Sequence, residues 1–353
     1  MIPNLYVHFP FCASKCAYCA LHSRAGASRG EMEAYSRRIA GEIAALGQGP
    51  FDTVYFGGGT PSMCPVEAVL EAVAPKLAPG AEFTVELNPA DVDKRLLAML
   101  AKYGVNRLSI GVQSFDDNVL RAMGRRHSSK GAVKAFLACR EAGFANVGID
   151  LIAGYPEGGG SWERTLEAAA DLGPDHASVY TLILEEGTPL ARAAEAGHVA
   201  VPGDGDALSE LYSARDALAA IGLERYEISN FARRGFECRH NMAVWAGEDY
   251  LGLGEGAKGR MGLRRTDSGA VVETLAPEAD ALERALFALR TRGGLDIDRA
   301  GRLWPVLTPR LGAWRELMER NAALGLVRKT AAGAWALTAR GAEVCDSILG
   351  EML

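Results

Sequence analysis

The sequence predicts an α/β fold: an open, partial barrel of six parallel strands, TIM-like in its strand and helix alternation, followed by a smaller helical domain. Three observations support this prediction. Short apolar runs alternate with segments of helical periodicity, glycine and polar residues directly follow several of those runs, and the last part of the chain is patterned as helices around one hairpin. A complete barrel of this type needs eight strand–helix units, so six units predict a barrel that stays open.

The predicted strands are short apolar runs bounded by turn residues. Strands that alternate with amphipathic helices form a parallel sheet with helices on its faces. In chain order, the six runs are Leu5–His8, Thr53–Gly57, Glu82–Glu86, Arg107–Gly111, Asn146–Leu151 and His176–Leu184.

Helices are predicted between these runs from apolar residues spaced three and four positions apart. The longest such segment lies between the first two strands, and its apolar face consists of Met32, Tyr35, Ile39, Ile43 and Leu46. The same spacing recurs at 66–77, 96–103, 133–137 and 208–221. These helices would supply the layer that covers the sheet.

The composition is that of an ordinary soluble globular protein. Its 353 residues suggest about two domains, and a formal charge of -6 with a pI of about 5.7 argues against nucleic acid as a partner. No apolar stretch reaches the roughly 18 residues of a membrane-spanning helix. The first residues also lack the charged and apolar regions of a secretion signal. We therefore expect a cytoplasmic protein without a membrane span, for which only peripheral membrane contact stays open.

Three of the seven cysteines lie on one loop after the first predicted strand. Cys12, Cys16 and Cys19 have C-x3-C-x2-C spacing, and such crowding indicates metal ligation in a reducing compartment rather than disulfides. A four-iron cluster takes thiolates as its usual ligands, so three cysteines leave one iron without a protein ligand. A structural zinc site is the alternative, because His22 would complete a Cys3His set.

Glycine and polar residues follow the next four predicted strands at their carboxyl ends. Parallel α/β barrels build their binding sites at this end of the strands. The residues concerned are Gly57, Gly58, Gly59, Thr60, Glu86, Gln113 and Asp150, with Arg125 further along the chain. Three successive glycines favour close approach of backbone amides to a ligand, with a tight turn as the alternative. The two carboxylates end apolar runs and require a partner, which is either a ligand or a structural salt bridge.

The cysteine loop, with Tyr18 before its last cysteine, resembles the signature of radical S-adenosylmethionine (SAM) proteins. The run Tyr6–Cys12 further resembles the oxygen-independent coproporphyrinogen III oxidase family. The resemblance implies a radical SAM barrel of the partial (β/α)6 type, a [4Fe-4S] cluster held by Cys12, Cys16 and Cys19, and SAM bound at the open iron. Such a site makes a 5'-deoxyadenosyl radical when an electron is supplied, so an electron donor is an implied partner.

The same resemblance implies roles for the residues at the strand ends. The segment Gly57–Thr60 matches a glycine motif that contacts the amine of SAM, with Gly58, Gly59 and Thr60 as the contact residues, and Glu86 matches the carboxylate that holds its ribose. Tyr6 and Tyr18 match aromatic residues beside the cluster and the cofactor. Positions that contact a second SAM in the dehydrogenase branch of the family are matched by Gln113, Arg125 and Asp150.

A second motif region follows the last predicted strand. His240 lies near a cysteine, a methionine and a tryptophan, a composition that suits a heme pocket, while a buried structural histidine is the alternative. The segments Tyr226–Ala232 and Cys238–Asn241 resemble motifs of HemW-type heme chaperones, which makes His240 the candidate heme contact. Two positions depart from that pattern, because Val244 replaces a common tyrosine and Lys258 a common histidine.

The chain is expected to divide into three parts. Residues 1–260 form the barrel with its heme-pocket extension, 261–278 a linker or hairpin, and 279–353 a winged-helix-like domain. The last part combines helical periodicity with a strand–turn–strand pattern across Leu326–Leu337. Winged helices often bind DNA, but the acidic chain favours a cap over the barrel mouth or a protein-docking module.

Two functions fit these resemblances. One is a heme chaperone that binds heme and delivers it to recipient proteins, and the other is oxygen-independent coproporphyrinogen III dehydrogenase, an enzyme of heme biosynthesis. The dehydrogenase branch has a further cysteine where this chain has Leu21, and a substantial segment before the residue that Tyr6 matches. Both features favour the chaperone, whose partners would be heme and heme-accepting proteins. A zinc-stabilised regulator is a third class, which leaves the strand-end motifs unexplained.

Overall fold

The computed structural model describes residues 2–156 and 161–353 and has an α/β architecture. Its centre is a 12-stranded sheet in which seven strands, consecutive in the sheet, run parallel: β11 (Tyr250–Leu253) and, beside it, the six strands at the predicted runs. These six strands are β1 (Asn4–Phe9), β4 (Phe51–Gly58), β5 (Leu77–Leu87), β6 (Arg107–Gln113), β7 (Asn146–Ala153) and β8 (His176–Thr181). Each overlaps one of the six predicted runs, although β8 ends at Thr181 instead of Leu184.

The parallel strands do not close into a complete barrel. β1 pairs with β4 and with β11 (Tyr250–Leu253), whereas β8 pairs with β7 and β10 (Asn230–Ala232), which in turn pairs with β9 (Glu224–Arg225). The sequence pattern does not predict β11, because its four residues include a glycine. Gly252 is required there, since an added Cβ would lie 2.1 Å from the carbonyl oxygen of Lys258 on the neighbouring strand.

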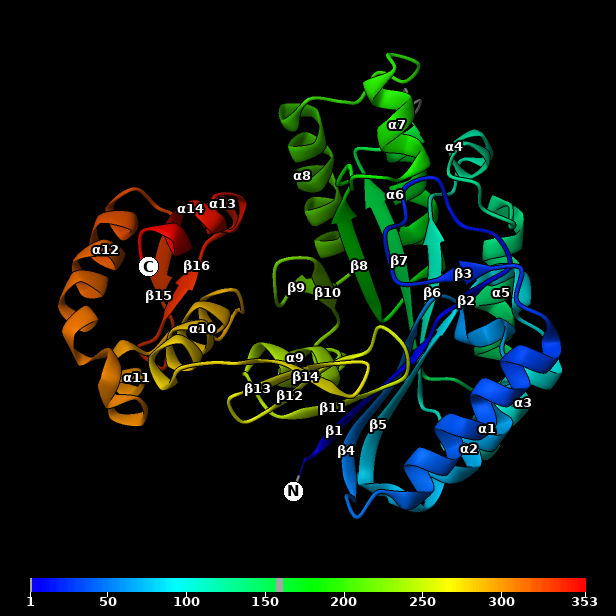
Figure 1. Cartoon of the computed structure of the whole chain (residues 1–353). Coiled ribbons are helices and arrows are strands. Elements are labelled where there is room, and N and C mark those ends of the chain that lie inside the picture. The colour runs from blue at the N-terminus through cyan, green and yellow to red at the C-terminus, as the bar shows by residue number, and fades with distance from the viewer. Residues whose placement is uncertain (1, 157–160) are drawn as a thin grey trace.

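Helices cover the outer face of the parallel strands (Figure 1). They are α1 (Arg29–Ala45), α2 (Glu67–Val73), α3 (Lys94–Lys102), α5 (Ser129–Glu141), α6 (Ser161–Leu172) and α8 (Asp204–Ala220), whereas α4 (Asp117–Ala122) and α7 (Pro189–Glu195) lie at the carboxyl ends of the strands. As predicted, α1 buries the apolar face from Met32 to Ile43. The predicted face of α5 is partly wrong, since Leu137 is 49% exposed while Phe136 and Cys139 are buried. Alanines complete the buried face of α5, and their small side chains give a weak periodic signal.

The cysteine loop lies between two short parallel strands, β2 (Phe11–Cys12) and β3 (Arg24–Ala25). The Ala17 amide donates to the Met123 carbonyl at 3.0 Å, and the Leu190 amide donates to the Ala17 carbonyl at 2.9 Å. The loop is therefore tied to α4 and α7 near the carboxyl ends of the parallel strands (Figure 1).

The segment after β11 continues the sheet. β12 (Lys258–Met261), β13 (Arg264–Asp267) and β14 (Ala270–Thr274) pair antiparallel in succession, and β12 pairs with β11. The interval 261–278 therefore contains a hairpin that belongs to the sheet.

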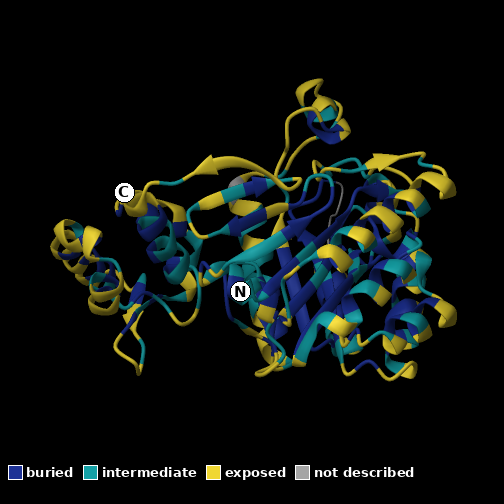
Figure 2. Cartoon of the chain, turned by 60° about the horizontal axis from the view of Figure 1, so that its bottom comes forward, coloured by how far each residue is buried: buried dark blue, intermediate teal, exposed yellow. Residues whose placement is uncertain are grey.

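A second unit follows, with a hydrophobic core of its own around Leu289, Trp314 and Met318. Its elements are α10 (Pro277–Leu289), α11 (Ile297–Leu303), α12 (Leu311–Ala323), β15 (Val327–Lys329), β16 (Trp335–Leu337), α13 (Ala339–Glu343) and α14 (Cys345–Gly350). β15 and β16 form an antiparallel hairpin beside the helices. Figure 2 shows buried residues on the inner faces of both units and exposed residues on the outer helix faces.

The two units meet along α9 (Arg239–Trp245) and α10. Trp245 packs edge-on against Phe287, with ring centroids 5.3 Å apart. Arg260 of β12 forms ion pairs with Asp280 and Glu283 of α10, and its side chain is only 3% exposed. These contacts hold the second unit against one edge of the sheet. Among the described helices, none is both long and apolar enough to cross a membrane.

Candidate functional site

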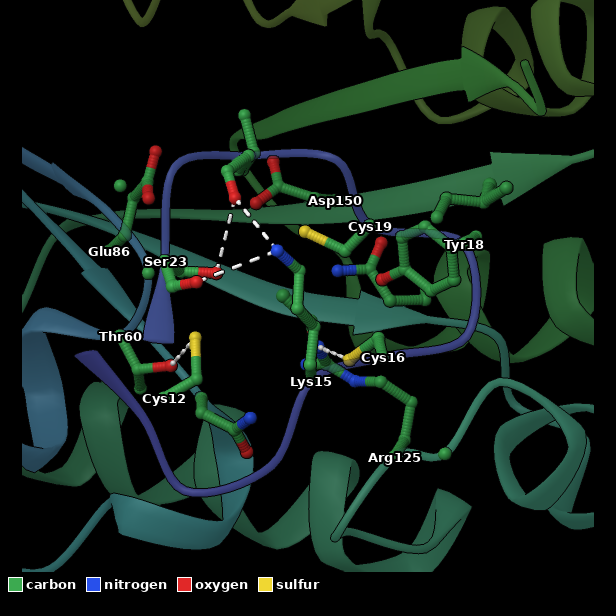
Figure 3. Close-up of a pocket in the computed structure, with 18 of the residues that line it drawn as sticks. Cys12, Lys15, Cys16, Tyr18, Cys19, Ser23, Thr60, Glu86, Arg125 and Asp150 are labelled. Atoms are coloured by element: carbon green, nitrogen blue, oxygen red, sulfur yellow. Dashed lines mark hydrogen bonds between the residues drawn. The ribbon is translucent and has the colours of Figure 1, made fainter. Parts of the chain in front are cut away.

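A cavity of about 810 Å³ opens at the carboxyl ends of the parallel strands, beneath the cysteine loop. Its volume falls within the range of about 300–1,000 Å³ that is usual for small-molecule and cofactor sites. Twelve of the thirteen predicted site residues line it, namely Tyr6, Cys12, Cys16, Tyr18, Cys19, Gly58, Gly59, Thr60, Glu86, Gln113, Arg125 and Asp150. Figure 3 shows that the labelled members of this set come from several strands and from the loop around one space.

The three cysteines of the loop are free thiols and partly exposed to the cavity. The Thr60 hydroxyl donates to the Cys12 sulfur at 3.5 Å, and the Arg125 guanidinium donates to the Cys16 sulfur at 3.6 Å. Burial raises the pKa of the Cys19 thiol. Each thiol thus has its own surroundings on the wall of the cavity.

The described residues around these thiols do not form a site for a single metal ion. Within the described chain, no three His, Cys, Asp or Glu side chains converge closely enough to hold one metal ion. His22, the fourth ligand of the zinc alternative, is not among the cavity-lining residues, and its carbonyl bonds the His8 ring at 2.7 Å. Three separated thiolates around an open space match the ligand number that a four-iron cluster with one free iron needs.

The glycines after β4 serve close packing between chain segments. Gly58 has a φ of 110°, and an added Cβ would lie 2.6 Å from the His8 ring. An added Cβ on Gly59 would lie 2.6 Å from the carbonyl oxygen of Phe11. The Gly59 amide donates to the Phe9 carbonyl at 2.8 Å, and the Gly58 amide bonds the Glu86 carboxylate. Both amides are engaged within the protein, so close packing accounts for these two glycines, and approach of the segment to a ligand stays a prediction at the border of the cavity.

Two inward-facing carboxyl groups lie at the wall of the cavity. The Tyr55 hydroxyl donates to Glu86 at 2.8 Å, and the Ser109 hydroxyl donates to Asp150 at 3.1 Å. Burial, together with the neighbouring Asp150 carboxylate, raises the pKa of Glu86 to about 7. Burial also raises the pKa of Asp150. In the described part of the chain, neither group forms an ion pair with Lys or Arg, which argues against the salt-bridge alternative.

Gln113 and Arg125 meet at the end of β6. An added Cβ on Gly111 would lie 3.0 Å from the Gln113 side-chain nitrogen and 3.2 Å from the Arg125 guanidinium, so glycine makes room for both. The Arg125 guanidinium also donates to the Gly111 carbonyl. Gln113 has a φ of 67°, a conformation that costs free energy for a residue with a side chain. Strain of this kind concentrates at binding sites.

The two tyrosines lie on different sides of the cavity. Tyr6 bonds the His8 ring at 3.0 Å and stacks on Tyr55 with centroids 6.1 Å apart. Tyr18 meets Tyr155 edge-on at 6.4 Å. Burial raises the pKa of both Tyr6 and Tyr18, so both hydroxyls stay protonated at neutral pH.

His240 is the one predicted site residue that the cavity does not include. Its side chain is buried, one ring nitrogen bonds the Thr53 hydroxyl at 2.8 Å, and its amide donates to Glu82 at 3.0 Å. Burial and the nearby Arg107 guanidinium lower the pKa of the ring to about 4. The ring lies behind Tyr6, 6.4 Å from it between centroids. Its environment is that of the buried structural histidine which the sequence left as the alternative.

Several lining or supporting residues escape the sequence reasoning. Tyr55 holds Glu86, and the two-residue alternation of β4 could have placed it on the inner face with Gly57. Leu182 and Ile183 line the cavity because β8 ends before them, whereas their apolar character suggested a longer strand.

Comparisons with known proteins agree with this geometry. Residues 6–175 match the radical SAM superfamily. The chain is 35% identical to "Heme chaperone HemW" of Mycobacterium tuberculosis, over 99% of this chain and 94% of that protein. It is 38% identical to "Radical S-adenosyl methionine domain-containing protein 1, mitochondrial" of Bos taurus, over 82% and 68% of the two chains. Its structure is similar to that of coproporphyrinogen III oxidase (HemN) from Escherichia coli, with a TM-score of 0.84, 22% identity, and 99% and 90% coverage.

Proposed function

The chain belongs to the radical SAM superfamily, in the group that includes the HemW proteins, and from this premise we propose that it is a heme chaperone. In this proposal it binds heme and delivers it to recipient proteins. The observation that carries the proposal is similarity over 94% and 78% of the length of two proteins named heme chaperone. The likeness to HemN, at 22% identity, concerns the fold.

The residues at the cavity fit a resident [4Fe-4S] cluster. Cys12, Cys16 and Cys19 would hold it, since they are free and border one cavity. A cluster held there would supply one-electron reduction of SAM when a donor protein provides the electron. The contacts from Thr60 and Arg125 to two of the sulfurs would hold the side chains of Cys12 and Cys16 in place at the cavity.

The wall opposite the cysteines supplies groups that suit SAM. Glu86 and Asp150 lack ion-pair partners in the described chain, so they are free to accept hydrogen bonds from ribose hydroxyls or an amine. Tyr55 orients Glu86 from below, and Tyr6 provides an aromatic surface beside it. Gln113 and Arg125 border the same space from β6 and the segment after α4.

The proposal is tested by separating heme uptake from porphyrinogen chemistry. The protein is purified without oxygen, its cluster is reconstituted, and heme binding is followed by absorption titration. Transfer is then measured to an apo-protein that gains activity with heme. We expect uptake and transfer, and no anaerobic conversion of coproporphyrinogen III with SAM and a reductant. Turnover of coproporphyrinogen III would overturn the choice in favour of the dehydrogenase.

A further inference from the structure

Large apolar side chains stand exposed at the border of the cavity, and we call four of them the apolar rim. They are Leu21 of the cysteine loop, Tyr180 near the end of β8, and the partly exposed Leu182 and exposed Ile183, which follow that strand. Leu21 is 58% exposed, Tyr180 45% and Ile183 66%. Single exposed apolar residues are ordinary, but several such residues around one cavity indicate a binding surface.

The apolar rim is held in place by the backbone. The Leu182 amide donates to the Ala153 carbonyl at 2.8 Å, and the Glu185 amide donates to the Ile183 carbonyl at 3.1 Å. The hydrogen bond from Leu190 to Ala17 ties α7, which follows this segment in the chain, to the cysteine loop that carries Leu21. The two parts of the rim border the same cavity.

Two cations of the cavity, Lys15 and Arg125, have no carboxylate partner within the described residues, and Arg125 is engaged by the Cys16 sulfur and the Gly111 carbonyl. The Lys15 ammonium bonds only the carbonyls of Leu21 and Ser23, each at 3.5 Å. Figure 3 shows the Lys15 side chain extending into the space between the thiols and Asp150. Arg126, another lining cation, is already paired with Asp91 at 3.1 Å. Lys15 is thus free to attract a carboxylate of a ligand.

Acidic residues lie on the other side of the rim. Glu185 lines the cavity next to the exposed Ile183 and Leu184, and Glu186 follows it. They repel the carboxylates of a bound ligand. A flat ligand with an apolar face and an acidic edge would consequently turn that edge toward Lys15.

We propose that the apolar rim binds one face of heme at the mouth of the cavity, with the heme propionates directed toward Lys15. This inference rests on the proposed function and locates its cargo site. It separates heme uptake from His240, which lies buried behind Tyr6 and outside the cavity. Heme held at the rim would cover the opening to the cysteine loop.

The main test compares glutamate substitutions at two aliphatic residues of similar exposure, Ile183 and Leu324. Ile183→Glu places a charge on the rim, and Leu324→Glu is the control, since Leu324 is 63% exposed in the second unit. Burial of such a side chain contributes enough free energy that we expect heme affinity to fall about tenfold for Ile183→Glu. Leu324→Glu should bind heme as the wild type does. Iron and sulfide content, measured for both, checks that the cluster site is intact.

The role of Lys15 is tested with Lys15→Gln and two ligands, heme and heme dimethyl ester. We expect the substitution to lower affinity for heme about fivefold and to leave affinity for the ester unchanged, because the ester carries no propionate charge.

The outcomes separate this inference from the proposed function. If the wild type binds no heme, the proposed function fails and the rim fails with it. If the wild type binds heme and Ile183→Glu binds it equally well, the rim is overturned while the chaperone stands. Equal loss of heme and ester affinity in Lys15→Gln would overturn the placement of the propionates.

Discussion

Two glutamates on β5 show how differently the two ends of the barrel interior use buried charge. Glu82 accepts hydrogen bonds from the amides of Arg239 and His240 at 2.9 and 3.0 Å and so holds the start of α9. Glu86, four residues further on the same strand, accepts a hydrogen bond from the Tyr55 hydroxyl and faces the cavity. The first carboxylate is satisfied by the chain, and the second is left with capacity for a ligand.

The same contrast separates Cys238 and His240 at α9 from the three cysteines of the cysteine loop. Cys238 lies buried at the start of α9, and its neighbour His240 bonds Thr53, so both belong to the interior that supports the sheet. Cys12, Cys16 and Cys19 border open space. A chemically versatile residue therefore marks a ligand site only where the fold leaves part of its bonding capacity unused.

The largest effect is expected from removing one cavity thiol. Cys16→Ala takes one of three ligands, so cluster binding should be lost after anaerobic reconstitution, with the broad visible absorption absent. Cys345→Ala is the matched control, because Cys345 is buried in the second unit away from the cavity. Iron and sulfide per chain are measured in both. Equal iron in the two variants would remove Cys16 from the ligand set.

The next effect concerns the two glutamates directly. In Glu82→Gln, an NH2 group replaces one of the two carboxylate oxygens that accept hydrogen bonds from the Arg239 and His240 amides. One amide then loses its acceptor, so the free energy of unfolding should fall by about 3 kcal/mol. Glu86→Gln loses no backbone acceptor of a helix, and its free energy of unfolding at pH 7 should be unchanged or slightly higher. Urea unfolding of both variants gives the comparison. A loss in Glu86→Gln as large as in Glu82→Gln would contradict the distinction between the two ends.

The sequence predicts the cavity end of the barrel well for a physical reason. Parallel strands all present their carboxyl ends at one edge, so Gly58, Glu86 and Asp150 could be brought together from strand positions alone. The other end depends on packing. His240 is assigned to the interior by the bond from its helix to Glu82 and by Thr53, contacts that join residues far apart in the chain. No local sequence pattern predicts these long-range contacts.

The pH dependence of stability offers a smaller effect at the cavity end. The pKa of Glu86 is about 7 in the folded protein and 4.5 in the unfolded chain, so the folded state holds the proton more tightly. The contribution of Glu86 is therefore fully present below pH 4.5 and is lost as the pH rises to about 7. Because the Glu86 side chain is partly exposed, its contribution to the free energy of unfolding should change by about 2 kcal/mol between these two pH values.

Glu86→Gln tests this dependence, because glutamine does not titrate. The free energy of unfolding of the wild type relative to the variant should decrease between pH 5 and pH 8, and the two curves should run parallel above pH 8. Parallel curves across the whole range would mean that Glu86 keeps an ordinary pKa.

The smallest effect on ligand binding is expected at His240. His240→Gln can retain a bond to Thr53, so we expect a loss of about 1 kcal/mol in the free energy of unfolding. Heme affinity should stay within twofold of the wild type, because the ring lies behind Tyr6 and does not border the cavity. A tenfold loss of heme affinity in His240→Gln, with Ile183→Glu unaffected, would reverse the comparison. The interior end of the barrel would then be the one that meets heme, and α9 would have to move away from Glu82 to expose it.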